Sequence, residues 1–168
     1  FRERIKINGV QMSKAYLVKF INSHLLFLEK ERFSFFEMTV ALAFDYFANK
    51  KVDYGIIEVG LGGRLDATNI IIPELSLITN ISKDHEKFLG DTRSKIANEK
   101  AGIIKPNVPV VLVERDNETY PVFEKAAKSQ GAPLIVAKEH NYSTDLLGNY
   151  QKKNINGVVS LINLIPNV

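Results

Sequence analysis

Glu58 is the first side chain whose position suggests chemistry. It lies near the end of an apolar run at 54–59 and directly before the glycine-rich segment 60–63. Glycine permits a sharp turn and a close approach of a ligand to the backbone, and a carboxylate beside such a turn suits a hard cation. Segment 60–63 is not a Walker A phosphate loop. Taken alone, Glu58 is equally compatible with a solvated acid at a strand end.

His85 occupies a comparable place after a second apolar run. The run at 75–79 leads into the polar segment 79–85, which ends with this histidine. A neutral imidazole can bind a metal ion through one ring nitrogen. A single histidine in a loop is more often a surface residue, but the agreement of two strand ends strengthens the functional interpretation.

Lys100 lies in the last turn of a helix expected at 92–101, before the stop signals Gly102 and Pro106. A cation is favourable near the C-terminus of a helix because of the helix dipole. This is sufficient to explain Lys100, and its spacing alone gives it no further role.

The surrounding pattern predicts the elements that must position these side chains. Apolar runs without strict alternation are typical of buried parallel strands, and they fall at 54–59, 75–79, 108–113 and 134–137. Helical spacing with start and stop signals predicts helices at 14–30, 36–49, 92–101, 118–130 and 154–165. We therefore expect an α/β fold, with a mostly parallel sheet and helices on both faces.

The composition is that of an ordered globular chain. The 168 residues include 45% hydrophobic residues, and a net charge of +3 arises from 22 basic and 19 acidic side chains that form no long blocks. We expect one domain with one core, no nucleic-acid partner, no membrane span, and a monomer. The lack of cysteine excludes disulfides and fits a cytoplasmic location. The first residue is Phe1, so we expect a fragment of a longer protein.

Five sequence blocks, in order, resemble the folylpolyglutamate synthase/dihydrofolate synthase family of the Mur ligase superfamily. The blocks are SFFE at 34–37, EVGLGGRLDATN at 58–69, ITNISKDH at 78–85, LGDT at 89–92 and NEKAGIIK at 98–105. The resemblance covers nearly the whole chain. It implies a P-loop NTPase-like central domain that is incomplete at its N-terminus, and a magnesium- and ATP-dependent ligase.

The resemblance also implies roles for the three side chains introduced above. Glu58 and His85 match magnesium ligands on the ATP phosphates. Lys100 matches a lysine that carbon dioxide converts to a carbamate, which would help to hold a second Mg²⁺. These three residues are the expected catalytic and metal-binding group.

Two further segments match the part of the family that contacts the pterin end of the substrate. One is Leu65, Asp66 and Ala67, and the other is Ser34, Phe35 and Phe36. An aromatic ring could stack on a flat pterin, but ordinary core packing is equally compatible with either phenylalanine.

Asn154 matches a family asparagine that approaches the adenine of ATP. The segment before it, 138–147, is shorter than is usual in the family. A helix N-cap is an alternative role for this residue.

The family's glycine-rich phosphate loop, of the type GKG[ST], does not occur in the sequence. We expect it before residue 1, with a serine ligand to magnesium, and we expect a glutamate-ligase domain after residue 168. The implied reaction of the intact protein is ligation of L-glutamate to dihydropteroate or folate, and the chain alone should be inactive. The alternatives are a truncated nucleotide- or pterin-binding remnant and a Mur-type amino-acid ligase.

Overall fold

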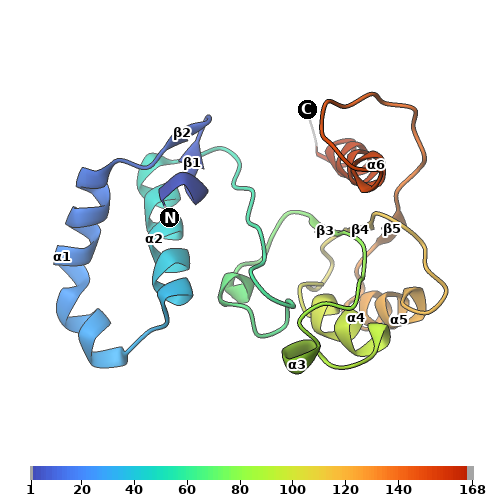
Figure 1. Cartoon of the computed structure of the whole chain (residues 1–168), viewed down its shortest axis with the longest axis horizontal. Coiled ribbons are helices and arrows are strands. Elements are labelled where there is room, and N and C mark those ends of the chain that lie inside the picture. Colours follow the sequence, from blue (N-terminus) through green and yellow to red (C-terminus); the bar gives the residue numbers. More distant parts are fainter. Residues whose placement is uncertain (1, 166–168) are drawn as a thin grey trace. The chain divides into compact units, whose positions relative to one another are not determined.

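The computed structural model describes residues 2–165 and divides into two compact units, residues 1–58 and 59–168 (Figure 1). Each unit contains its own hydrophobic cluster, so the described residues form two cores where the sequence suggested one. The reason is local. Apolar side chains before residue 50 pack between two helices and a hairpin, whereas those after residue 77 pack between strands and helices.

The first unit is a helical pair with a small β-hairpin. After a 3-10 turn at Arg2–Arg4, strands β1 (Lys6–Ile7) and β2 (Val10–Gln11) pair in antiparallel fashion, and helices α1 (Lys14–Glu31) and α2 (Phe35–Lys50) follow. The sequence predicted both helices, but not the hairpin. Its turn is Asn8-Gly9, with φ of 49° and 79°, which is the residue pair that two-residue hairpin turns favour.

Polar contacts supplement apolar packing between α1 and α2. The buried residues are Ile5, Met12, Phe20, Leu42 and Tyr46. Beside them, the Tyr16 hydroxyl on α1 donates to Oδ2 of Asp45 on α2 over 2.6 Å. Burial and this carboxylate raise the pKa of Tyr16 to about 12, so its hydroxyl keeps its proton, and this hydrogen bond, to a higher pH than an ordinary tyrosine would.

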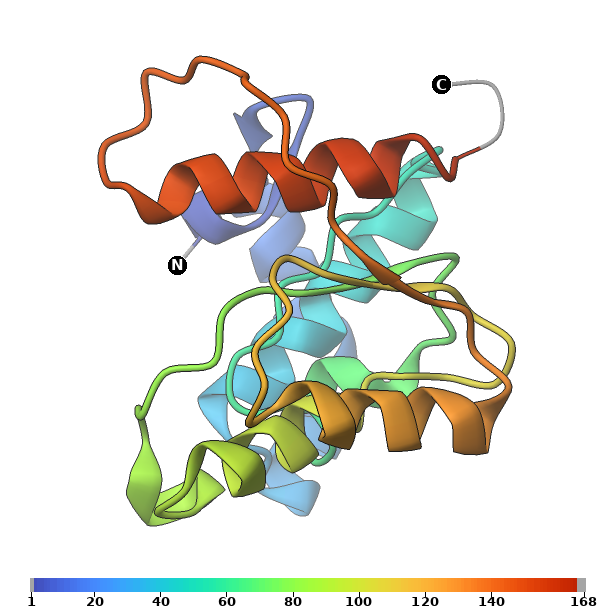
Figure 2. The same cartoon turned by 90° about the vertical axis from the view of Figure 1, so that its right-hand side faces the viewer.

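The second unit is built on a parallel sheet, as predicted. Its strands β3 (Ser76–Ile78), β4 (Val110–Leu112) and β5 (Leu134–Val136) lie in the order β3-β4-β5. Helices α4 (Arg93–Ala101) and α5 (Tyr120–Gln130) cover one face and α6 (Tyr150–Ile162) the other (Figures 1 and 2). The short helices are η2 (Ala67–Ile70) and α3 (Glu86–Leu89). The predicted α/β class is confirmed.

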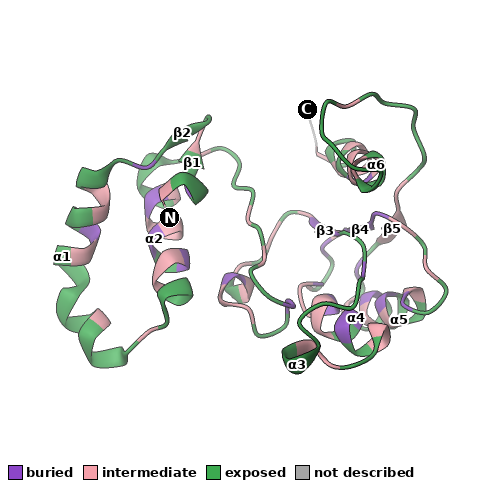
Figure 3. Ribbon diagram, in the orientation of Figure 1, coloured by how far each residue is buried: buried purple, intermediate pink, exposed green. Residues whose placement is uncertain are grey.

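The core of this unit lies between the sheet and helices α4 and α5. Strand β4 is buried throughout, and buried positions also lie on the two helices (Figure 3). On the opposite face, Gly157 lets α6 approach the sheet, because a Cβ there would lie 2.5 Å from Val113 Cγ2 and 3.2 Å from Leu77 Cδ1.

Residues 54–59 do not form the strand that we predicted. They are irregular, and Ile56 is 96% exposed. A buried strand must satisfy its backbone N–H and C=O groups through a neighbouring strand. Within residues 2–165, the three-stranded sheet offers 54–59 no such pairing. Local apolar character is therefore insufficient, because strand formation depends on a partner.

No helix among residues 2–165 has the length and apolar character required to cross a membrane.

Candidate functional site

The glycine-rich segment lies directly against the C-terminal end of α4. A Cβ on Gly63 would lie 2.7 Å from the Glu99 carbonyl oxygen and 3.1 Å from Lys100 Cα. A Cβ on Gly102 would lie 2.3 Å from Arg64 Cβ. The glycines therefore permit backbone contact between this segment and the helix that carries Lys100. The segment that leads to Leu65, Asp66 and Ala67 and the helix that carries Lys100 are therefore brought together.

Hydrogen bonds hold the segment in this position. The backbone N–H of Arg64 donates to the Glu99 carbonyl over 2.8 Å. The Asn69 side-chain amide donates to the Gly102 carbonyl over 3.0 Å and to the Arg64 carbonyl over 3.1 Å. Lys105 Nζ in turn donates to the Asn69 carbonyl over 2.9 Å. The loop is therefore anchored at Arg64 to the last turn of α4 and at Asn69 to the residue just after this helix.

An ion pair reinforces the same contact. The Arg64 guanidinium donates through Nε and Nη2 to the Glu99 carboxylate, at 3.1 to 3.3 Å. The Glu99 side chain is 21% exposed, so the pair is shielded on the carboxylate side. This pair was not predicted from the sequence, because residues 35 positions apart give no local signal.

Lys100 is half-buried, and its ammonium makes no hydrogen bond or ion pair with the residues that the structure describes. Some other lysines of this unit are engaged, although several, such as Lys125 and Lys128, also make no such contact among the described residues. Lys95 pairs with Asp91, and Lys153 pairs with Glu114. Lys100 is thus a cation held in place by its helix but left available for another partner.

Asp66 has a clear structural function in the loop. Its Oδ1 accepts from the backbone N–H and the hydroxyl of Thr68, at 2.9 and 2.5 Å, and its Oδ2 accepts from the Leu61 N–H at 2.8 Å. A carboxylate offers about four acceptor sites, so Oδ2 keeps one for a ligand. Next to Asp66, Leu65 is 80% exposed and Ala67 is partly exposed.

His85 lies on the exposed turn before α3. Its backbone is left-handed, with φ of 52°, and its N–H donates to Asp84 Oδ1 over 2.8 Å. The imidazole Nε2 lies 3.8 Å from Asp84 Oδ2, and the ring makes no side-chain cap of α3. Its ring is therefore exposed and available to a ligand.

Glu58 is also exposed, and its carboxylate has no hydrogen-bond or ion-pair partner within the described part of the chain. Within residues 2–165, no three His, Cys, Asp or Glu side chains gather into a metal site. The expected set contains only two such side chains, Glu58 and His85. Oxygen donors suit Mg²⁺ better than an imidazole does, so the donor set fits this ion only if Lys100 supplies carbamate oxygens.

Arg93, at the start of α4, connects two loops that follow strands. Its Nε donates to the Ile81 carbonyl over 3.1 Å, and Nη2 lies 3.0 Å from Asp116 Oδ2. Nη1 reaches Glu118 Oε2 at 3.1 Å. The loop after β3 and the loop after β4 are thus tied together near the carboxyl edge of the sheet. Arg93 was not among the side chains predicted from the sequence.

We expect Arg93→Gln to weaken the pH dependence of stability in acid. The Arg93 guanidinium holds the pKa of the Asp116 carboxyl below its usual value. The pair therefore stabilises the native state above the unfolded-state pKa of aspartate, about 4, and this contribution is lost as pH falls through the lower folded-state pKa. The free energy of unfolding, measured with urea at about pH 7 and about pH 3, should differ less between the two pH values for Arg93→Gln than for the unsubstituted chain.

Arg115→Gln is the matched control, because Arg115 stacks on the Tyr120 ring, 4.1 Å from its centroid. It should keep the pH dependence of the unsubstituted chain. An unchanged acid dependence in Arg93→Gln would contradict the assignment.

Ser34, Phe35 and Phe36 lie at the start of α2. The Ser34 hydroxyl accepts from the Glu37 N–H at 3.2 Å, and the Glu37 carboxylate accepts from the Ser34 N–H at 2.7 Å, which forms a capping box. These bonds hold the pKa of Glu37 below its usual value. Phe35 and Phe36 are 64% and 41% exposed, so the core-packing alternative is wrong for both.

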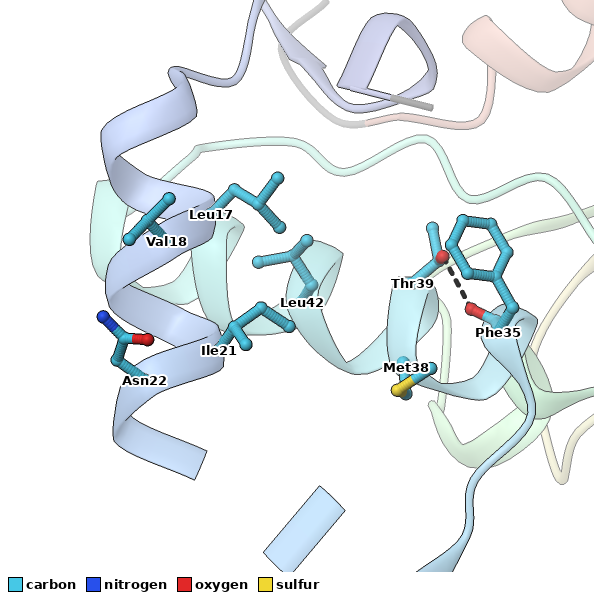
Figure 4. A pocket seen from close by; sticks show the side chains of 8 residues that line it. All are labelled: Leu17, Val18, Ile21, Asn22, Phe35, Met38, Thr39 and Leu42. Atoms are coloured by element: carbon cyan, nitrogen blue, oxygen red, sulfur yellow. Dashed lines mark hydrogen bonds between the residues drawn. The ribbon is translucent and has the colours of Figure 1, made fainter. Parts of the chain in front are cut away.

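Phe35 instead borders an apolar hollow between α1 and α2 (Figure 4). The hollow has a volume of about 360 Å³. Its apolar lining includes Leu17 and Ile21 from α1 and Met38 and Leu42 from α2. An exposed aromatic ring beside an apolar hollow is suitable for a flat, partly apolar ligand.

Asn154 lies inside α6, because this helix begins at Tyr150 and not at 154 as predicted. The N-cap position belongs to Asn149, so the N-cap alternative for Asn154 is wrong. The Asn154 amide donates to Gln151 Oε1 over 3.1 Å, which leaves its own side-chain carbonyl oxygen able to accept.

The arrangement just described agrees with a known family. The Mur ligase middle domain model matches residues 8–163, and the chain therefore belongs to the Mur ligase middle domain family.

Among curated proteins, a dihydrofolate synthase/folylpolyglutamate synthase of Bacillus subtilis (strain 168) is 41% identical over 141 residues, which are 80% of this chain and 33% of that protein. A folylpolyglutamate synthase structure from Thermotoga maritima has a TM-score of 0.84 and 33% identity, over 97% of this chain and 44% of that chain. A structure described as an FPGS–AMPPCP–folate complex has a TM-score of 0.85 and 31% identity, over 95% and 47%.

The chain spans about a third of the length of its Bacillus relative and less than half of the two structures. The resemblance to folylpolyglutamate and dihydrofolate synthases is thus confirmed for the segment that this chain represents.

Proposed function

We propose that this chain is part of the central domain of an ATP-dependent ligase that joins L-glutamate to dihydropteroate or folate. The observation that carries the proposal is the seating of the 60–69 loop on the end of α4 beside Lys100, in a chain whose relatives are named folylpolyglutamate and dihydrofolate synthases. The phosphate loop and the glutamate-ligase domain would come from other parts of the intact protein.

The proposed reaction has two steps. A carboxylate oxygen of the pterin substrate attacks the γ-phosphorus of ATP, which forms an acyl phosphate and releases ADP. The glutamate amine then attacks the acyl carbon, phosphate leaves, and the amine loses a proton as the amide forms. Charge develops on phosphoryl oxygens, so catalysis depends mainly on positioning and electrostatic stabilisation.

Glu58, His85 and carbamylated Lys100 are the residues that we propose to hold Mg²⁺. When bound, this ion neutralises negative charge on the phosphoryl group. The exposure of Glu58 and His85 and the absence of an ion-pair partner for Lys100 within the described residues support these assignments. Carbamylation replaces the repelling ammonium with an anionic oxygen donor.

For the pterin end of the substrate, we propose contacts from Leu65, Asp66 and Ala67 and from Ser34, Phe35 and Phe36. The remaining acceptor site on Asp66 Oδ2 suits an N–H group of a pterin, and the exposed phenylalanine rings suit its flat face. The Ser34 hydroxyl already caps α2, so its contribution would be to fix the position of the two rings.

We propose that Asn154 approaches the adenine of ATP through its side-chain amide. We also propose a monomeric, cytoplasmic protein that binds small molecules and has no nucleic-acid or membrane partner. The even mixture of 22 basic and 19 acidic side chains supports the view that nucleic acid is not a partner.

One alternative rests on a specific observation. The sequence contains no GKG[ST] phosphate loop, which favours a non-catalytic nucleotide- or pterin-binding protein if the natural protein also lacks it.

The test uses the full-length protein encoded by the gene. We expect ATP hydrolysis that requires both L-glutamate and either dihydropteroate or folate, and Glu58→Ala should reduce it by a factor on the order of 100. Glu74→Ala, which removes another exposed acid of the chain, should leave the rate unchanged. Substrate binding without hydrolysis would support the alternative function, and full activity of Glu58→Ala would refute the metal assignment.

A further inference from the structure

Arg64 and Glu99 form an ion pair in addition to the backbone contact between the same two residues. The loop already has the backbone bond from Arg64 to the Glu99 carbonyl, the Asn69 bonds and the close glycine contacts. The ion pair adds a forked interaction between guanidinium and carboxylate on top of these. A planar fork of this kind restricts orientation as well as distance.

The pair lies between two segments of the proposed site. Arg64 directly precedes Leu65 and Asp66, and Glu99 directly precedes Lys100. The pair therefore joins the segment that we assign to the pterin end of the substrate to the helical turn that carries Lys100.

Glu99, the residue before Lys100, is engaged by Arg64, and Lys100 makes no ion pair among the described residues.

We infer that the Arg64–Glu99 ion pair is a positioning device, which fixes the position of the loop that we assign to the pterin relative to Lys100. The inference rests on the proposed ligase function. Neither residue touches the reacting atoms, so the pair should affect the catalytic rate more than the binding of ATP. A displacement of about 1 Å in such an arrangement can reduce a rate about 100-fold.

The test is a charge-reversal cycle in the full-length enzyme. Arg64→Glu and Glu99→Arg should each lower kcat at least about tenfold and change the KM for ATP by less than about twofold. The double variant, which restores an opposite-charge pair in reversed order, should recover most of kcat. Lys95→Gln is the matched control, because it removes an exposed ion pair from the same helix, and it should leave kcat unchanged.

Hydrogen exchange of the 61–69 amides, measured without substrates, supplies a second observable. Both single reversals should speed this exchange, and the double variant should slow it again. If the unsubstituted enzyme ligates glutamate and the two single-reversal variants have the same kcat and hydrogen exchange, the inference is wrong and the proposed function stands. If kcat falls but the double variant recovers neither kcat nor protection, the pair has no positioning role. An unsubstituted full-length enzyme without ligase activity would instead refute the proposed function.

Discussion

Replacing Lys100 by methionine in the full-length protein should reduce glutamate ligation by a factor on the order of 100 or more while the protein remains folded. Methionine preserves the apolar stem and the helix propensity of this position. It cannot react with carbon dioxide, whereas in the proposed reaction the lysine amine adds to the carbon atom, loses a proton and becomes an anionic carbamate. The expected loss therefore arises from a missing oxygen donor.

Lys100→Arg separates this explanation from a simple need for positive charge. Arginine retains the cation near the helix C-terminus, but its guanidinium keeps its proton and does not form a carbamate. We expect Lys100→Arg to be as inactive as Lys100→Met. Added bicarbonate should stimulate the unsubstituted enzyme at low carbon dioxide and should not stimulate either variant.

Lys128→Met provides the control for the helix dipole. Lys128 lies in the last turn of α5, as Lys100 lies in the last turn of α4. Its substitution removes the same favourable charge from a helix end, but it should leave ligation unchanged. Steady-state rates and a thermal unfolding curve for each variant are the required measurements. Full activity in Lys100→Arg would show that the carbamate assignment is wrong.

Gly102→Ala should have the largest structural effect of a single added methyl group. The backbone at Gly102 has φ of −63° and ψ of −11°, which alanine adopts without strain. However, the new Cβ would lie 2.3 Å from Arg64 Cβ and 2.4 Å from Arg64 Cα. Because one of these atoms is backbone, a rotamer change cannot relieve the clash, and the 60–69 loop must move away from α4.

We expect a loss of about 1–3 kcal/mol in the free energy of unfolding, as is typical of overpacking. The Arg64 amide should exchange faster with solvent, because its bond to the Glu99 carbonyl would break. In the full-length enzyme, ligation should fall at least about tenfold, since the loop would be displaced from Lys100. Urea unfolding, hydrogen exchange and ligation rates measure these three effects.

Gly55→Ala is the matched control. A Cβ on Gly55 would have Ile57 Cδ1 as its nearest neighbour, at 3.9 Å, which is an ordinary contact. This variant should keep the stability and the Arg64 amide protection of the unsubstituted chain. If Gly102→Ala preserved that protection as well, the seating of the loop on α4 would not be the tight contact described above.

Local features of this protein follow from its amino-acid order. Ser13, Ser34 and Thr92 cap helices through bonds to backbone N–H groups a few positions away, and Gly131 ends α5 with φ of 60°. Such features depend on steric preferences and hydrogen bonds within one turn. The same local reading could have identified the Asn8-Gly9 hairpin, whose turn signal was present. The sequence blocks between 34 and 105 also identified the family.

Other features depend on segments that meet only in the fold. The apolar run at 54–59 has strand composition but no strand, because its hydrogen bonds need a partner that the local sequence cannot specify. Arg64 and Glu99 pair across 35 positions, and Asp66 proves to be a loop anchor as well as a candidate ligand contact. Composition and spacing describe what each residue can do. Only tertiary packing decides which other residue lies within hydrogen-bonding distance, and therefore which side chains, such as Lys100, remain available for chemistry.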